Sequence, residues 1–271
     1  MRGIGIGVRG NFWEDILSRS LPIDFVEITA DHFFDTIQEL DHIDHYPTAV
    51  HSLSLSLGSP DPIDDDYLNK LLEIAERVDA MVMSDHLAFT QTRGIDLGHL
   101  NPIPLNNKLF SRIEGKVNRI QQASGRRFLL ENITSHLTLA QDIPEAVFLS
   151  ELAHKTGCGI LLDVTNLYVN AVNHNFDPMR YITDLDLNAV SQLHLIGYSK
   201  RDGVLQDDHA AAVQQELLTL LEKVLTVNPD IPVLVEWDRN FPTPEALHWN
   251  LKRISETIDG CGHSSVQIAG M

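Results

Sequence analysis

Eight short apolar runs with the character of β-strands recur along the chain, separated by stretches with the spacing of amphipathic helices. The runs are, in order, IGIG, FVEIT, TAVHSL, VMSDHL, FLLEN, ILLDV, QLHLIG and VLVEWD. Strands that alternate with helices predict a parallel sheet joined by right-handed crossovers. Eight such repeats without a change in composition favour a single closed (β/α)8 TIM barrel, with an open doubly wound sheet as the alternative.

The intervening helices are predicted from apolar positions that repeat every three or four residues. The clearest opens at Asp64 and places Leu68, Leu71, Ala75 and Val78 on one face. Comparable helices are expected at residues 107–124, 144–156, 178–187, 210–227 and 243–258. We therefore assign residues 1–259 to the barrel domain and expect residues 260–271 to form a flexible C-terminal tail.

The composition excludes several classes of function. The chain carries 20 basic and 38 acidic residues, and its net charge of −18 repels nucleic-acid phosphates and anionic membrane surfaces. No segment approaches about 18 uninterrupted apolar residues, and the N-terminal residues lack the apolar core of a signal peptide. Only two cysteines are present, so a disulfide framework is not expected. These features predict a soluble cytoplasmic protein with no nucleic-acid or membrane partner.

Six of the eight runs contain or end in a side chain that can bind a metal. These side chains are His51, His86, Glu131, Asp163, His194 and Glu236. The carboxyl ends of the strands of a TIM barrel meet at one mouth, and alternate strand residues face the same side. The six side chains are therefore expected to converge. The motif DDH after the seventh run adds Asp207 and His209.

Eight convergent ligands are too many for one ion. A catalytic zinc or iron commonly uses about three protein ligands and keeps a position open, so eight ligands indicate two or three metals. Imidazole and carboxylate ligands without thiolate suit iron, manganese or zinc. The eight residues are thus both the candidate metal ligands and the candidate catalytic residues.

Each candidate also has a simpler structural explanation. A single strand histidine is more often a hydrogen-bonded core residue than a ligand. The DDH motif can be a solvated turn in which Asp208 caps a helix that begins near Ala210. However, Glu131, Asp163 and Glu236 each follow two large apolar residues and would be buried without a partner unless a cation or donor lies nearby. One shared metal centre explains all of them together.

Several polar residues outside this set have weaker signals. Glu27 lies in the second run, near its end, and is a candidate acceptor for the imidazole of a ligand. Asn132, Asn166 and Asn170 are candidates to orient ligands or substrate, with ordinary loop hydrogen bonding as the alternative. No glycine-rich nucleotide motif or nucleophile elbow occurs, so the sequence gives no support for a nucleotide cofactor or Ser–His hydrolysis.

The chain resembles the multinuclear non-haem iron-dependent oxidative enzymes (MNIO), formerly an uncharacterised domain family, which includes the methanobactin-maturing iron enzyme. The resemblance spans about residues 51–238 in seven ordered motifs, HSLSLSLGSPDP, SDHLAF, LLEN, TGCGILLDVTNLYVNAVNH, HLIGY, DDH and VEWD. It implies a xylose isomerase-like TIM barrel, two or three iron ions, O2 as co-substrate and modification of cysteines in a ribosomally synthesised precursor peptide. It also implies a separate partner protein that binds the leader of that peptide.

Carried over to the matching positions, the resemblance implies the same eight ligands that strand position selects. Two positions depart from the family pattern. Thr165 stands where asparagine is common in a DVNN motif, and Asp208 replaces the threonine of a DTH motif. Either Asp207 or Asp208 can therefore supply the carboxylate, and the alignment favours Asp207.

Two other functions stay open at this point. A sugar isomerase or epimerase with manganese, magnesium or cobalt would use similar strand-end ligands and would work without O2. A non-catalytic metal-binding or partner-binding module would keep the ligands without turnover. An apurinic-site endonuclease of similar architecture is disfavoured by the net charge of −18.

Overall fold

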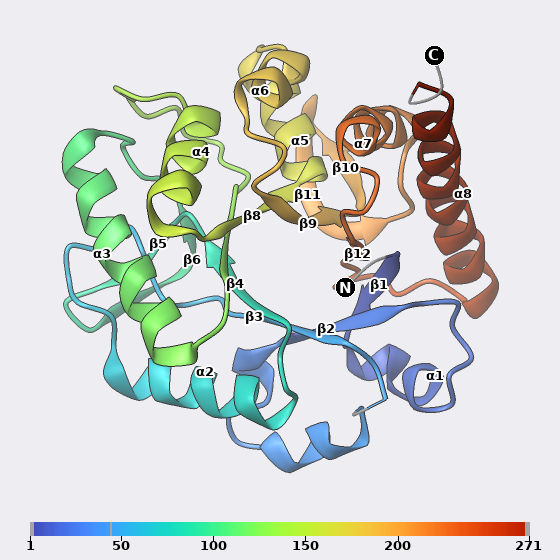
Figure 1. The fold of residues 1–271 in the computed structure, drawn as a ribbon, viewed down its shortest axis with the longest axis horizontal. Coiled ribbons are helices and arrows are strands. Elements are labelled where there is room, and N and C mark those ends of the chain that lie inside the picture. Colours follow the sequence, from blue (N-terminus) through green and yellow to red (C-terminus); the bar gives the residue numbers. More distant parts are fainter. Residues whose placement is uncertain (1–2, 44, 269–271) are drawn as a thin grey trace.

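The computed structural model describes residues 3–43 and 45–268, and over these residues eight parallel strands close into a barrel ringed by helices (Figure 1). The barrel strands are β1 (Ile4–Gly7), β2 (Phe25–Thr29), β3 (Thr48–His51), β4 (Val82–His86), β7 (Phe128–Glu131), β8 (Gly159–Asp163), β9 (Val190–Leu195) and β12 (Val233–Val235). They follow one another around the barrel in chain order, and β12 closes onto β1. Each predicted apolar run forms one barrel strand, so the predicted TIM barrel is confirmed.

The helices pack outside the strands and shield them from solvent. They are α1 (Trp13–Leu17), α2 (Asp65–Arg77), α3 (Asn107–Ser124), α4 (Glu145–Thr156), α5 (Val164–His174), α6 (Pro178–Asp184), α7 (Gln215–Val227) and α8 (Pro244–Ile268), with short 3-10 turns at Gly10–Phe12, Ala30–His32 and Ile37–His42. As predicted, α2 is capped by Asp64, whose carboxylate accepts from the backbone N–H groups of Asp66 and Tyr67, and it buries Leu68 and Leu71.

Leucine side chains occupy part of the barrel interior below its mouth. Leu129, Leu161 and Leu234 are fully buried and lie two residues before strand-end carboxylates. Gly5 leaves the space that the ring of Phe25 occupies, since a Cβ on Gly5 would lie 2.6 Å from that ring. Three of the strand-end carboxylates therefore lie above buried leucines.

Two antiparallel hairpins interrupt the strand-helix alternation and were not predicted. One joins β5 (Phe89–Thr92) to β6 (Ile95–Asn101), and the other joins β10 (Gly197–Arg201) to β11 (Val204–Ala211). Residues 204–211 form β11 and pair with β10, so α7 begins only at Gln215. The helix that was predicted from residue 210 therefore starts too early. The alternative in which Asp208 caps that helix is wrong, since Asp208 lies within β11.

The sequence also missed α5, which begins directly after β8 with Asp163 at its N-cap. At the other end of the chain, α8 runs on to Ile268, through the boundary predicted at residues 259/260. The tail is therefore helical as far as Ile268, while its flexibility stays a prediction and residues 269–271 lie outside the described part. None of the helices in the described part is long and apolar enough for a membrane crossing.

Candidate metal centre

The barrel brings the six strand-end candidates together at the carboxyl-terminal mouth. All of them are at most 8% exposed, and they are His51 on β3, His86 on β4, Glu131 on β7, Asp163 on β8, His194 on β9 and Glu236 just after β12. The strand register places His86 opposite Glu131 and Asp163 opposite His194. Together with His209 and Asp238, these side chains form three groups, each with ligand atoms within 4.8 Å of one another, and Asp207 belongs to none of the three.

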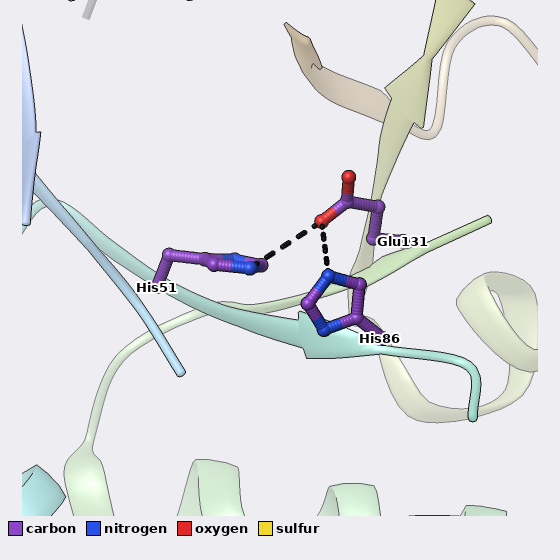
Figure 2. A group of neighbouring side chains, drawn as sticks. All are labelled: His51, His86 and Glu131. Carbon is purple, nitrogen blue, oxygen red and sulfur yellow. Dashed lines mark ion pairs between the residues drawn. The ribbon is translucent and has the colours of Figure 1, made fainter. Parts of the chain in front are cut away.

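The first group consists of His51, His86 and Glu131 (Figure 2). Oε2 of Glu131 lies 3.6 Å from Nε2 of His51 and 3.5 Å from Nε2 of His86. These separations are long for hydrogen bonds, and this oxygen has no hydrogen-bond partner within the described residues. Three donor atoms that face one point without bonding to each other suit a shared cation.

The second group contains Glu131, Asp163, His194 and Glu236, all buried. Nδ1 of His194 lies 3.2 Å from Oε1 of Glu131 and 3.2 Å from Oε2 of Glu236. Oδ2 of Asp163 has no hydrogen-bond partner in the described part of the chain. Glu131 thus belongs to both the first and the second group, with one oxygen in each.

The third group is formed by His209, Glu236 and Asp238. Nδ1 of His209 lies 2.9 Å from Oδ2 of Asp238 and 3.5 Å from Oε2 of Glu236. Nε2 of the same ring lies 2.9 Å from Oδ1 of Asp207. The sequence missed Asp238, although it follows Glu236 by two residues in VEWD and so continues the same alternation.

The two aspartates of the DDH motif differ in their contacts, although Oδ1 of each is buried without a hydrogen bond to a described residue. Oδ2 of Asp208 accepts a hydrogen bond from Oγ of Ser199 at 2.6 Å, whereas Asp207 faces the ring of His209. His209 itself has a positive φ of 49°, a left-handed conformation that a non-glycine residue adopts at a cost of about 1 kcal/mol. In this conformation the imidazole lies between Asp207 and Asp238.

The two imidazoles of the first group differ in how Nδ1 is held. Nδ1 of His51 forms a hydrogen bond of 2.8 Å with Oγ of Ser84, whereas Nδ1 of His86 lies 3.4 Å from Oδ1 of Asp85 and has no hydrogen bond to a described residue. In both rings the other nitrogen, Nε2, faces Glu131. Orienting partners of this kind are typical of metal-ligating histidines.

The second group has the same kind of outer support. Nε2 of His194 hydrogen-bonds to Oε2 of Glu27 at 3.2 Å, as the sequence predicted, and Gln192 donates to the same carboxylate. Oδ1 of Asp163 accepts from the backbone N–H of Asn166 at 2.7 Å. Nδ1 of His194 and Oδ2 of Asp163 are thereby directed to the interior of the group.

Two of the other polar positions singled out in the sequence support the loops around the centre. The side chain of Asn132 bonds to the backbone N–H and C=O of Asp163, which ties β7 to β8. Thr165, the departure from the family pattern, donates from Oγ1 to the carbonyl of Ile196 at 2.7 Å. Both residues act on the backbone beside the candidate ligands.

Carboxylates crowd the centre, and the pKa values of its members show the effect. Burial, reinforced by the charges of Asp207 and Glu131, raises the pKa of Asp163 well above its usual range. Burial opposes the charged form of His194, yet the carboxylates of Glu27 and Glu131 hold its pKa well above the usual value. Such a concentration of negative charge favours the binding of divalent cations.

An apolar cavity of about 360 Å³ opens beside the centre, between the loop at 133–144 and helices α5 and α6. Leu87 and Ile133, which line it, follow the candidate ligands at the ends of β4 and β7. Leu137 and Phe176 also line it and are 63% and 41% exposed. A cavity of this size and lining suits an organic ligand or a few side chains.

Comparison with known proteins places this geometry in a family. Residues 3–259 match the family described as RiPP precursor modification enzyme MbnB/TglH/ChrH, where RiPP denotes a ribosomally synthesised and post-translationally modified peptide. The chain belongs to this family. It is 34% identical over 252 residues to a UPF0276 protein of Acaryochloris marina, and the match covers 91% of each chain. It is also 34% identical over 252 residues to a UPF0276 protein of Caulobacter vibrioides, and this match covers 90% of each chain. The family resemblance predicted from the sequence motifs is confirmed.

Solved structures support the fold assignment of this MbnB/TglH/ChrH family member. A xylose isomerase domain protein from Planctomyces limnophilus superposes with a TM-score of 0.64 at 12% identity, over 97% of this chain and 98% of the other. Endonuclease IV from Thermus thermophilus superposes with a TM-score of 0.64 at 17% identity, over 95% and 99%. At these identities the likeness shows the fold alone, and it confirms the predicted xylose isomerase-like barrel.

Proposed function

We propose that this protein is a multinuclear non-haem iron enzyme that uses O2 to modify cysteine residues of a ribosomally synthesised precursor peptide. The observation that carries the proposal is the sharing of a carboxylate between groups. Glu131 belongs to the first and second groups, with one oxygen facing each. A shared carboxylate suits two or three neighbouring metals better than a single ion.

The residues present fit such metals. Oε2 of Glu131, Oδ2 of Asp163 and Nδ1 of His194 are buried and lack a hydrogen bond to any described residue. Burying polar atoms in this way costs free energy unless a cation satisfies them. The first group is also a set of two histidines and one carboxylate without thiolate, which is the ligand set of non-haem iron(II) enzymes.

The eight predicted ligands, His51, His86, Glu131, Asp163, His194, Asp207, His209 and Glu236, are proposed to hold two or three irons. When bound, the iron supplies the capacity to activate O2 and to accept electrons from the substrate. The chain's own residues hold that chemistry in place: Glu27 fixes the ring of His194, and Ser84 fixes the ring of His51. Leu129, Leu161 and Leu234, fully buried below three of the carboxylates, limit the access of water from that side.

The cavity beside the centre is proposed to bind side chains that flank the modified cysteine. Its volume of about 360 Å³ accommodates a few side chains and is too small for a complete leader segment. A separate partner protein that binds the leader fits this limit. We assign the reaction to the cytoplasm, where the thiols of a precursor peptide stay reduced.

The test is anaerobic purification, metal analysis by mass spectrometry and measurement of O2 consumption with a short cysteine-containing peptide encoded beside this gene, with and without a partner protein encoded there. We expect iron to co-purify and the mass of the peptide to change only when O2 is present. Protein that modifies the peptide equally well without iron or without O2 would contradict the proposal.

The same preparation separates the two alternatives. A sugar isomerase or epimerase would convert sugars anaerobically with manganese, magnesium or cobalt. A non-catalytic binding module would bind the peptide or its partner protein with the same affinity after His86→Ala and Glu131→Ala, and would show no turnover in any metal state.

A further inference from the structure

Arg9 holds the two carboxylates of the third group together. Its Nε and Nη2 each lie 2.6 Å from Oδ1 of Asp238, and Nη2 lies 3.3 Å from Oε1 of Glu236. Nη1 donates to the carbonyl of Val8 at 3.0 Å, and the side chain of Arg9 is only 11% exposed. A guanidinium group held at all its nitrogens is a fixed part of the site.

Barrel closure brings Arg9 to this place. Strand β1 pairs with β12, and Ile6 lies opposite Val235. Arg9 and Asp238 each follow these partners by three residues, so they leave the barrel side by side. Gly7 leaves the room that the guanidinium needs, since a Cβ there would lie 3.2 Å from Nη1 of Arg9.

The two carboxylates divide their oxygens between Arg9 and His209. Oδ1 of Asp238 and Oε1 of Glu236 bind the guanidinium, whereas Oδ2 and Oε2 lie 2.9 Å and 3.5 Å from Nδ1 of His209. The contact between Nδ1 and Asp238 is a hydrogen bond. The contact between Nε2 and Oδ1 of Asp207 is equally short, but that oxygen is without a hydrogen bond to the described residues.

We propose that Arg9 and Asp238 form a positioning pair for the metal centre, and this inference rests on the function proposed above. Arg9 orients both carboxylates, and Asp238 holds Nδ1 of His209 so that Nε2, beside Asp207, is the nitrogen that binds metal. Asp238 then acts through His209 and is not itself a ligand. His51 shows the same division, with Nδ1 on Ser84 and Nε2 toward the centre.

The positioning pair has no substitute nearby. Among the described residues, Arg9 is the only lysine or arginine that forms an ion pair with a carboxylate of the three groups. The loss of one such outer partner commonly lowers metal affinity by about 10–100-fold. Removal of either member should therefore weaken the metal bound by His209 and leave the metal of the first group in place.

The experiment compares wild type with Arg9→Gln, Arg9→Lys and Asp238→Asn by anaerobic equilibrium dialysis with Fe²⁺ against increasing concentrations of a chelator. We expect Arg9→Gln and Asp238→Asn to bind the most weakly held metal about 10–100-fold less tightly, and Arg9→Lys to recover part of the loss. The control is Arg77→Gln, which removes a comparable guanidinium-carboxylate pair with Asp41 far from the centre and should change nothing. Circular dichroism confirms that each variant is folded.

A second measurement reads the ligating nitrogen directly. In ¹⁵N NMR of histidine-labelled protein loaded with Zn²⁺, wild-type His209 should coordinate through Nε2 and keep a proton on Nδ1. Coordination of the metal through Nδ1 would overturn the positioning pair. Tighter metal binding in Arg9→Gln would also overturn it, because Arg9 would then act only as a cation that competes with the metal. Wild-type protein that binds no metal would overturn the proposed function itself, whereas unchanged metal binding in every variant would overturn only the pair.

Discussion

Glu131 lies 3.2 Å from Nδ1 of His194 through one carboxylate oxygen, while its other oxygen faces His51 and His86 at 3.6 and 3.5 Å. One side chain therefore takes part in two groups of candidate ligands. The position of β7 between β4 and β8 in the barrel explains this, because its terminal residue has a ligand-bearing strand on each side. A structural core carboxylate would instead be satisfied by fixed hydrogen bonds.

The first prediction concerns this shared carboxylate. Glu131→Gln keeps the size of the side chain but removes its charge and one acceptor, so both adjacent groups lose a ligand. We expect more than one metal per chain to be lost and peptide modification to fall by at least about 100-fold. Metal analysis and a single-turnover assay measure the two effects. Glu151→Gln, an exposed change on α4, is the control, and equal metal content in the two variants would contradict the prediction.

The second prediction concerns support from outside the ligand set. Glu27→Gln weakens the hold on Nε2 of His194 without removing any ligand. We expect metal affinity to fall by about 10–100-fold while the melting temperature of the metal-free protein changes little. Chelator competition measures the metal affinity, and calorimetry measures the melting temperature. Glu73→Gln, on the exposed face of α2, is the control. A large loss of stability with unchanged metal affinity would show that Glu27 is a structural residue.

The sequence predicts the barrel and most of the centre because both depend on periodicity. Strand alternation alone places Leu129 below Glu131 and Leu161 below Asp163, and parallel strands then bring the upper residues together. The carboxylates could be singled out for a further reason, since each follows apolar residues that must be buried. These are local properties of the chain, so no knowledge of the folded structure is needed.

The parts that escaped prediction depend on pairing between distant segments. The stretch around Asp208 can form either a helix start or a strand, and its pairing with β10 decides the outcome. The contact between Arg9 and Glu236 joins residues 227 positions apart and exists only because the first strand closes on the last. Composition and spacing carry no signal for such a contact.

The third prediction is a pH dependence of stability that arises from Glu145, one of the residues that line the cavity. Burial raises the pKa of Glu145 from its usual 4.5 to about 7, although Tyr181 donates a hydrogen bond to its carboxylate at 3.0 Å. The folded protein thus keeps a proton that the unfolded chain releases, and stability contributed by this group is lost as pH rises from 4.5 through 7.

Glu145→Gln removes this titration while keeping a polar group against Tyr181. We expect the variant to be more stable than wild type by about 1–2 kcal/mol at pH 8 and close to wild type at pH 4.5. Urea denaturation at both pH values measures the difference. A stability difference that does not change with pH would show that Glu145 ionises normally in the folded protein.

The fourth prediction concerns the apolar rim of the cavity. Leu137→Asp and Phe176→Asp place a charge where side chains of the peptide are proposed to enter, and both residues are already largely exposed, so folding should be little affected. We expect KM for the peptide to rise about 10-fold with kcat and metal content unchanged. Val227→Asp, at a site 59% exposed on α7, is the matched control. Equal KM values in all three variants would place the peptide elsewhere.

The last prediction concerns the hairpin that carries Asp207 and His209. Gly197 begins β10, and a Cβ at this position would lie 2.2 Å from the carbonyl oxygen of Ala212 and 2.6 Å from that of Ala211. These are backbone atoms, so Gly197→Ala must push β11 away from β10 and carry the imidazole of His209 with it. The barrel strands do not depend on this contact.

We expect Gly197→Ala to lose about 1–3 kcal/mol of stability and to bind the metal at His209 at least about 10-fold less tightly, with the first group unaffected. Gly115→Ala on α3 is the control, because no atom lies within 4 Å of its Cβ position and alanine favours a helix. Thermal denaturation and metal titration distinguish the two variants. Wild-type metal binding in Gly197→Ala would mean that the hairpin tolerates displacement, and that Asp207 and His209 are not held in place by its pairing.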